Sequence, residues 1–220
     1  KMKNIPISNL IVRCSSLHKI MTKSRVKGAL SETAKSYVHD QAKEIFYGIG
    51  SKIEGKYLDK GIRNEDKAIE MVNDVRFMDY RKNKIRKTNE WLTGECDIEG
   101  DNTIIDVKCS WSFDTFPAFN SEAEKMLKKS GYDYQVRGYM MLYNKPEAEV
   151  IWCMTSTPDD LLSTWDNKEI HKVDHIEPEL RITGAKIKRD KDIEKQMLIQ
   201  YELANTYFKE CLTELENKNK

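Results

Sequence analysis

Residues 94–108 contain the side chains whose types and spacing best suit chemistry. The small polar pair Asp101–Asn102 favours a two-residue β-turn between two short strands. This turn would place Asp97 directly opposite Asp106, and side-chain alternation would put Lys108 on the face of Asp106. Like charges in opposite positions destabilise a hairpin, and a divalent cation held by oxygen ligands is the economical compensation. Two carboxylates, a cation and a lysine suit the hydrolysis of phosphodiesters, which predicts a nuclease.

The opposite face of the same hairpin is apolar and is expected to face the core. Its side chains are those of Cys96, Ile98, Ile105, Val107 and Cys109. This pattern predicts a hairpin that packs inside the domain with one face and carries the carboxylates on the other.

The composition is typical of a soluble globular protein. Of the 220 residues, 33% are charged and 39% are hydrophobic, which argues against both a disordered and a membrane protein. We expect one domain over residues 1–220, large enough for a substantial core. No apolar run approaches the roughly 20 residues that span a bilayer, and no signal peptide is recognisable. A formal net charge of +1 decides little about nucleic-acid binding, because an acidic site can mask a basic surface.

The cysteines indicate a reducing environment. There are five, an odd number, and they are scattered without a CxxC pair. Structural zinc sites and iron–sulfur clusters require closely spaced cysteines, so neither is expected. The sequence therefore predicts reduced thiols and a cytoplasmic location.

Basic residues gather in two segments of the chain. One segment precedes the hairpin and contains Arg81, Lys82, Lys84, Arg86 and Lys87. The other lies near the N-terminus and contains Lys19, Lys23, Arg25 and Lys27. Each segment is compatible with a solvated face, and each is compatible with contacts to DNA phosphates, which need local rather than global positive charge.

Periodicity and capping residues predict the remaining elements. Helices are expected over 15–22, over 31–47 after Ser31, from Asn64 as a cap, over 120–143 with a break near Gly131, and over 189–217. Strands are expected within 75–92 and over 150–155. Residues 156–188 show no pattern that distinguishes loops from a late strand.

Glu65 is a further acidic candidate. It would open the helix capped by Asn64, where the helix dipole favours a carboxylate without any catalytic role. Beside the hairpin, the same side chain is a plausible third acidic ligand. Glu70 competes for this role, but it lies beyond the first turn and is more typical of a surface position.

Two other patterns carry less weight. His171 and His175 have a spacing that can bind metal on a helix, but their surroundings favour an irregular surface segment without a third ligand. Four aromatic residues follow the second strand of the hairpin, and we favour core packing over stacking on a DNA end. They are Trp111, Phe113, Phe116 and Phe119.

The order of these residues resembles the PD-(D/E)XK nuclease superfamily, and within it the lambda-type phage exonucleases. The residues that carry the resemblance are Glu65, Asp97, Asp106-Val107-Lys108, the following Cys109, Gln135 within 134–140, and the N-terminal segment 13–20. Cys96 stands where the superfamily name has proline, and Asp106 is the shorter variant of the second acid. The resemblance implies an α/β fold with a mixed central β-sheet flanked by α-helices.

The resemblance also implies roles for single residues. Asp97, Asp106 and the carbonyl of Val107 would hold Mg²⁺, with Mn²⁺ as a substitute and Glu65 completing the shell. Lys108 would orient or deprotonate a water, or stabilise developing negative charge, and the sequence leaves these roles open. Gln135 would orient the lysine or the water. Ser15 and Arg25 would contact a terminal phosphate, although a helix cap explains Ser15 equally well.

The function implied by the resemblance is exonucleolytic hydrolysis of linear double-stranded DNA. The family further implies 5′-to-3′ digestion, a homotrimer that encircles DNA, and action beside a single-strand annealing protein in phage recombination, in the phage or bacterial cell interior. Two alternatives stay open at this point. One is an endonuclease of the same superfamily, and the other is a DNA-binding module that has kept the fold without the chemistry.

Overall fold

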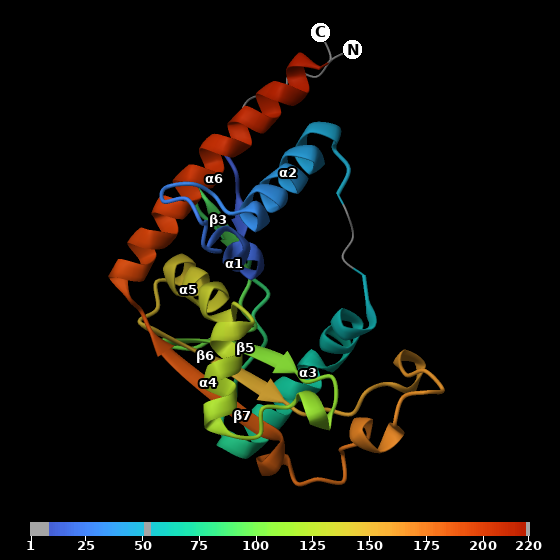
Figure 1. Cartoon of the computed structure of the whole chain (residues 1–220). Coiled ribbons are helices and arrows are strands. Elements are labelled where there is room, and N and C mark those ends of the chain that lie inside the picture. The colour runs from blue at the N-terminus through green and yellow to red at the C-terminus, as the bar shows by residue number, and fades with distance from the viewer. Residues whose placement is uncertain (1–8, 51–53, 219–220) are drawn as a thin grey trace. The chain divides into compact units, whose positions relative to one another are not determined.

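The computed structural model describes residues 9–50 and 54–218, which form two compact units (Figure 1). The terminal unit contains the described residues up to 50 together with 87–94 and 190–218. The central unit contains residues 54–86 and 95–189. All residues of the predicted hairpin from Glu95 onward lie in the central unit, so the arrangement of that unit determines the site.

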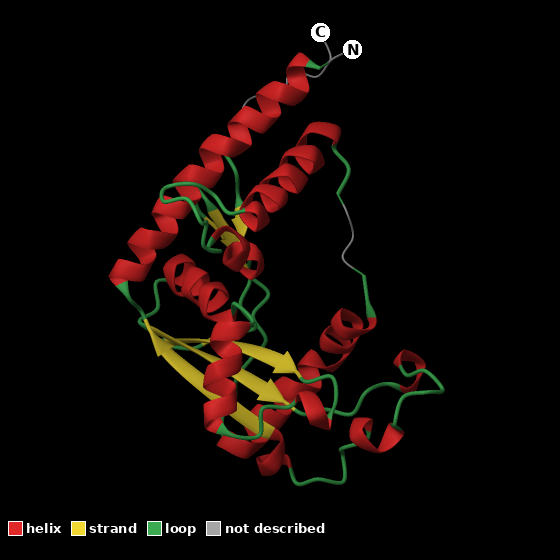
Figure 2. Cartoon of the chain, viewed as in Figure 1, coloured by secondary structure: helices red, strands yellow, loops and turns green. Residues whose placement is uncertain are grey.

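The central unit is built on a four-stranded mixed sheet in the order β4-β5-β6-β7 (Figure 2). Its strands are β4 (Ile98–Glu99), β5 (Thr103–Cys109), β6 (Glu147–Cys153) and β7 (Ile182–Lys188). The two inner strands, β5 and β6, run parallel, whereas β4 and β7 pair antiparallel with their neighbours. The carboxyl ends of β5 and β6 therefore lie at one edge of the sheet.

Helices cover both faces of this sheet. On one face, α3 (Lys56–Arg76) packs its apolar side chains against those of the three strands β4, β5 and β6. The other face contacts α4 (Asn120–Lys129) and α5 (Tyr132–Tyr143), which are separated by Gly131 at φ 73°. The expected mixed sheet with flanking helices, and the helix break near Gly131, are both confirmed.

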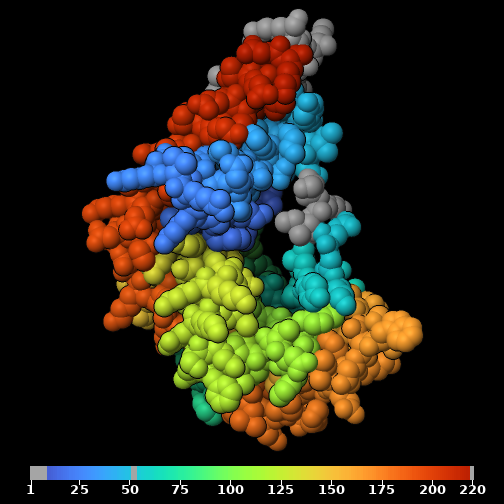
Figure 3. Space-filling view, in the orientation of Figure 1, coloured from blue at the N-terminus to red at the C-terminus, as the bar shows by residue number. Residues whose placement is uncertain are grey.

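Short 3-10 helices lie in two connections of the central unit. One, η2 (Phe113–Thr115), follows β5. Three more lie between β6 and β7, where no sequence pattern predicted an element: η3 (Asp159–Leu161), η4 (Lys168–His171) and η5 (Pro178–Arg181). This segment, orange in Figure 3, reaches the surface, and Trp165 within it is 94% exposed.

The terminal unit has its own small sheet, in the order β1-β3-β2. The strands are β1 (Val12–Arg13), β3 (Leu92–Gly94) and β2 (Lys87–Thr88). Its helical segments are η1 (Cys14–Ser16), α1 (Leu17–Ile20), α2 (Glu32–Tyr47) and α6 (Lys191–Asn217). Ser31 caps α2 as predicted, because its Oγ accepts a hydrogen bond from Ala34 N at 3.0 Å. Among the described residues, no helix is both long and apolar enough to cross a membrane.

The helix that carries Glu65 begins earlier than the sequence suggests. Its N-cap is Gly55 rather than Asn64, so the prediction that Glu65 opens a helix is wrong. Asn64 is buried within α3, and its side chain donates hydrogen bonds to Thr155 Oγ1 at 2.9 Å and to the carbonyl of Ser156 at 2.8 Å. A tertiary contact therefore uses the amide that looked like a local cap.

The far end of α3 is clamped to the sheet by a bidentate ion pair. Arg76 donates to both carboxylate oxygens of Glu149 on β6, at 2.8 and 2.9 Å. The Glu149 side chain is only 7% exposed, and Lys186 approaches it more loosely, at 3.9 Å. Gly184 on β7 leaves room for this carboxylate, because a Cβ at that position would collide with Glu149 Oε1.

We expect Arg76→Met to lower the free energy of unfolding by about 1–3 kcal/mol, because it leaves a nearly buried carboxylate without its main partner. Urea unfolding of the purified variant measures the effect.

Arg63→Met is a matched control on the same helix. Arg63 pairs with Asp160 at 2.6 Å, but both side chains are exposed, so this substitution should cost less than about 1 kcal/mol. Equal losses in the two variants would contradict the assignment of Arg76 as a clamp.

Candidate active site

The predicted hairpin register is present. Ile98 pairs with Ile105, and the amide of Gly100 donates to the carbonyl of Thr103 at 2.9 Å. Continuing this register beyond β4 would bring Asp97 opposite Asp106, but the ladder stops there. Instead, Asp97 Oδ2 accepts a hydrogen bond from the backbone amide of Val107 at 2.6 Å. The Asp97 carboxylate thus takes the place of a backbone acceptor at the edge of β5.

Asp106 is almost fully buried, at 1% exposure, in the middle of β5. Its Oδ1 accepts a hydrogen bond from Gln135 Nε2 on α5 at 3.2 Å. Its Oδ2 lies 2.7 Å from Lys108 Nζ and makes no hydrogen bond to any other donor among the described residues. Besides this ammonium, the carboxylate oxygen has lone-pair capacity left for a cation.

The protonation equilibria of the cluster reflect its crowded negative charge. Burial and the charge of Asp106 raise the pKa of Asp97 above its usual value of 3.8. Burial favours the neutral amine of Lys108, but the carboxylates of Asp106 and Asp97 outweigh it and raise its pKa. The Lys108 ammonium also lies 4.9 Å from the ring centroid of Tyr132. Lys108 is therefore held as a cation beside the two acids.

A cavity of about 570 Å³ opens onto this cluster, and it is lined by Glu65, Asp97, Val107 and Lys108. Glu65 reaches it from α3, and its Oε1 lies 3.3 Å from Lys82 Nζ. Asp106 and Gln135 lie behind these residues. The structure thus brings together all the side chains proposed for catalysis, together with Val107.

The donor set fits a divalent cation. Among residues 9–50 and 54–218, no three His, Cys, Asp or Glu side chains form a metal site by themselves. A cation would therefore rely on Asp97 and Asp106, with the remaining ligands drawn from the Val107 carbonyl, Glu65 and water. The remaining lone-pair capacity of Asp106 Oδ2 and the raised pKa of Asp97 both indicate that Lys108 alone does not balance the negative charge of this cluster.

The residues proposed to bind DNA are divided between the units. Arg81, Lys82, Lys84 and Arg86 lie in the central unit, whereas Ser15, Arg25 and Lys87 lie in the terminal unit. Several already have acidic neighbours in their own unit: Arg81 contacts Asp79, Lys82 contacts Glu65 and Asp66, and Arg86 contacts Glu95. Lys84, Ser15 and Arg25 are exposed, and Arg25 lines a cavity of about 560 Å³ that also contains Lys23 and Lys35.

Two weaker interpretations need correction. Phe113 and Phe119 are 53% and 67% exposed, so of the aromatic run only Phe116 is a fully buried core residue. His171 is buried rather than on the surface, and its Nδ1 contacts Thr157 Oγ1 at 3.2 Å and the carbonyl of Trp111 at 3.1 Å. His171 is thus part of the packing that supports the segment after β5.

The sequence interpretation missed two supporting residues. Tyr139 is buried on α5, and its hydroxyl accepts a hydrogen bond from Gln135 Nε2 at 3.0 Å. Lys60 on α3 is also buried. Both could have been found from helical spacing, because Tyr139 lies four residues after Gln135, and Lys60 falls at i−4 and i−8 from Asn64 and Ala68 on the inward stripe.

Comparison with solved structures finds a phage-related exonuclease from Haemophilus somnus 129PT that is 36% identical, with a TM-score of 0.89 over 95% of this chain and 98% of that chain. An alkaline exonuclease from Laribacter hongkongensis, also solved in complex with dAMP, matches at 13–14% identity with a TM-score of 0.64 over 95% of this chain and 93% of that chain. At that identity the likeness concerns the fold alone. No protein-family model and no curated protein matches.

The affinity for Mg²⁺ should increase with pH over a range in which an ordinary aspartate is already ionised. Because the pKa of Asp97 is raised above 3.8, cation binding must displace a proton from the aspartate pair. Displacement of one proton changes the apparent affinity by about tenfold per pH unit. Calorimetric titration with Mg²⁺ without DNA, in a series of buffers, measures the slope.

Asp106→Asn is the matched variant, since it removes the neighbouring charge and should reduce this slope as well as the affinity. A Mg²⁺ affinity that is independent of pH in the unmodified protein would show that Asp97 is not part of the cation site.

Proposed function

The chain belongs to the phage exonucleases, the lambda-type branch of the PD-(D/E)XK nucleases, and from this membership we propose that it degrades linear double-stranded DNA from its ends with Mg²⁺ as cofactor, in the 5′-to-3′ direction. The observation that carries the proposal is the convergence of Glu65, Asp97 and Lys108 on one cavity, with Asp106 directly behind. The likeness to the solved phage-related exonuclease extends over 95% of this chain, so the support for the proposal comes from nearly the whole fold.

Asp97, Asp106 and the Val107 carbonyl would hold Mg²⁺, with Glu65 completing or sharing the shell and Mn²⁺ as a substitute. When bound, the cation would supply Lewis-acid stabilisation of the negative charge that develops on the phosphate. Its charge would also replace Lys82 as the partner of Glu65, which lies 3.3 Å from Lys82 in this structure.

Lys108 has two roles compatible with its surroundings. Because Asp106 and Asp97 keep it protonated, it can donate a hydrogen bond to a phosphate oxygen and stabilise developing negative charge. A cation bound to the same carboxylates would lower its proton affinity and allow it to orient or deprotonate an attacking water. Either role requires the Nζ to stay beside the carboxylates, where the Tyr132 ring supports it.

Gln135 is proposed to position the acids rather than react. Its amide donates to Asp106 Oδ1 and to Tyr139 Oη, which fixes the rotamer of a buried carboxylate. With Oδ1 occupied in this way, Oδ2, which Lys108 Nζ approaches to 2.7 Å, would be the oxygen that binds the cation. Tyr139 supports this arrangement one helical turn farther along α5.

Family membership also supports proposals about the biological setting. We propose that the protein acts as a homotrimer on DNA ends, beside a single-strand annealing protein in phage-type recombination inside the bacterial cell. Ser15, Arg25 and Lys87 of the terminal unit are proposed to contact DNA, as are the basic residues that precede the hairpin.

The purified protein with Mg²⁺ should degrade linear duplex DNA and spare a closed circular duplex. Lys108→Ala should lower the rate by at least about 100-fold, because it removes a charge that stabilises the transition state. Comparing duplexes labelled at the 5′ and the 3′ ends determines the polarity.

Lys195→Ala, an exposed substitution on α6, is the control and should leave the rate unchanged. Cleavage of the closed circle would favour an endonuclease of the same superfamily. Absence of degradation with both Mg²⁺ and Mn²⁺ would favour a DNA-binding module that has kept the fold without the chemistry.

Removing Arg81 and Lys84 together should weaken binding to duplex DNA without a preference for sequence. Both side chains are exposed, and for each phosphate that is no longer neutralised the slope of log affinity against log salt should fall by about 0.9. The measurement uses the Lys108→Ala protein, so that the DNA is not degraded during the titration.

A double substitution of Lys191 and Lys195 on α6 removes the same charge elsewhere and serves as the control. An unchanged salt slope in the Arg81/Lys84 variant would assign these residues to a solvated face.

A further inference from the structure

Lys60 is a buried cation that the proposed chemistry does not use. It lies on α3 and is 1% exposed. Its Nζ donates to three backbone carbonyl oxygens, those of Ser110 at 2.5 Å, Trp111 at 2.9 Å and Thr155 at 2.7 Å. An ammonium has three hydrogens, so the donor capacity of Lys60 is fully used.

This arrangement is costly, because a charge is removed from water without an opposite charge beside it. None of the ion pairs among the described residues involves Lys60. Burial accordingly lowers the pKa of Lys60 to about 8. Besides the three carbonyl dipoles, the Lys60 ammonium has the Trp111 ring near it, with the centroid 5.9 Å from Nζ. A cation buried in this way without an acidic partner needs a reason beyond filling space in the core.

The three carbonyls belong to the place where the parallel strands separate. Ser110 and Trp111 follow directly on β5, and Thr155 follows β6 by two residues. At the end of β5, the backbone hydrogen bond from Ser110 N to the carbonyl of Cys153, at 3.0 Å, still joins the two strands. Beyond it, Lys60 supplies donors that the sheet no longer provides, and so joins α3 to both strand ends.

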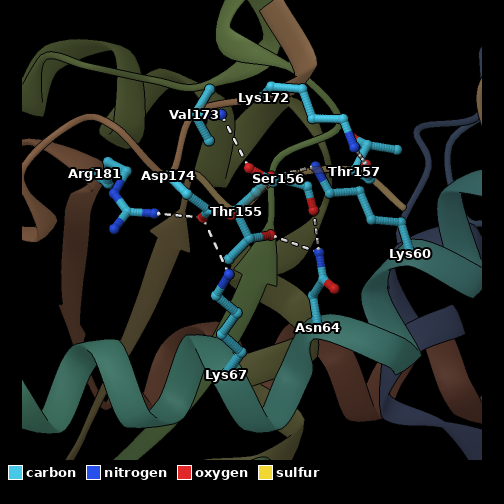
Figure 4. A network of polar contacts seen from close by, with 10 residues as sticks. All are labelled: Lys60, Asn64, Lys67, Thr155, Ser156, Thr157, Lys172, Val173, Asp174 and Arg181. Carbon is cyan, nitrogen blue, oxygen red and sulfur yellow. Dashed lines mark hydrogen bonds and ion pairs between the residues drawn. The ribbon is translucent and has the colours of Figure 1, made fainter. Parts of the chain in front are cut away.

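Asn64 repeats the contact one turn farther along α3, through Thr155 Oγ1 and the carbonyl of Ser156 (Figure 4). The next residue in the chain is Glu65, which lines the active-site cavity together with Ser110 and Trp111. Lys60 and Asn64 thus fix the part of the helix from which Glu65 extends, whereas Arg76 and Glu149 fix its other end.

We propose that Lys60 is a positioning residue for the nuclease reaction, which holds Glu65 in register with Asp97 and Lys108 by tying α3 to the carboxyl ends of β5 and β6. The inference depends on the proposed function, in which Glu65 serves the cation site. It predicts that a substitution of Lys60 lowers Mg²⁺ affinity and kcat more than a substitution elsewhere on α3 that lowers the free energy of unfolding by the same amount.

Lys60→Met keeps the length of the side chain but removes the charge, and Arg76→Met is the matched control at the opposite end of α3. Three quantities are measured for both: the urea midpoint, the Mg²⁺ affinity by calorimetry without DNA, and kcat and KM on linear duplex well below the unfolding temperature. We expect Lys60→Met to lower kcat and Mg²⁺ affinity by about tenfold or more, and Arg76→Met to change both less than about twofold at a similar stability.

Equal effects of the two substitutions on Mg²⁺ affinity and kcat would overturn the proposal and leave Lys60 as a purely structural contact. If Lys60→Met does not fold, Asn64→Ala removes the neighbouring hydrogen bonds and should show the same selective loss in a milder form. If the unmodified protein proves inactive as a nuclease, the Mg²⁺ affinities still decide whether Lys60 positions the site, so the two failures are distinguishable.

A rescue experiment tests the role of the ammonium itself. Lys60→Ala removes the atoms from Cγ to Nζ, which n-propylammonium can replace in size and charge. Added n-propylammonium should restore Mg²⁺ affinity in a concentration-dependent manner, whereas n-propanol, which offers one donor and no charge, should not. Equal rescue by both compounds would contradict a role for the cation.

Discussion

The structure depends on keeping two carboxylates together, one buried in the sheet and the other half-buried at the wall of the cavity. Asp106 is buried in the middle of β5, and Asp97 directly precedes β4, the strand that pairs with β5 in the hairpin. Their mutual repulsion and burial raise the pKa of Asp97, so the pair is held against its electrostatic preference. Holding the two carboxylates together also changes the backbone pairing of the hairpin. The ladder between β4 and β5 ends at Ile98, because Asp97 Oδ2 takes the Val107 amide that a continued strand would have used.

Two neighbouring side chains offset part of the free-energy cost of holding these carboxylates together. Lys108 brings a positive charge from the same strand face, and Gln135 brings a neutral donor from α5. At Asp106 Oδ2 the Lys108 ammonium is the neighbouring cation, and more donors at this oxygen would leave less capacity for a metal ion. The protein therefore keeps part of the acceptor capacity of this oxygen unfilled by hydrogen bonds. The positions of the two carboxylates must then be fixed by the surrounding elements. Helix α3 contributes to this because it contacts the sheet or its strand ends at both of its own ends, through Lys60 and Arg76.

Local rules were enough to predict the hairpin, and tertiary contacts explain most failures. The turn, the register and the apolar face follow from small polar residues and alternation within fifteen residues. The start of α3 could not be found this way, since Gly61 and Asn64 are typical of a loop and a cap until Thr155 and Ser156 are placed beside them. The small sheet of the terminal unit joins Val12 to Leu92, a pairing between distant parts of the sequence that no local pattern encodes. His171 looked like a surface residue because nothing in its sequence surroundings indicates Trp111 and Thr157.

The choice of a lysine at position 60 has a simple electrostatic reason. Where β5 and β6 separate, the unpaired groups are carbonyl oxygens, and a carboxylate could not satisfy them. A lysine paired with its own acid would add another negative charge close to Asp97 and Glu65, which already repel one another. An ammonium held by carbonyl dipoles closes the strand ends and adds only positive charge to an acidic neighbourhood. The same reasoning fits the position of the bidentate ion pair between Arg76 and Glu149, which brings a buried carboxylate to α3 only at the opposite end of the helix, away from the cavity.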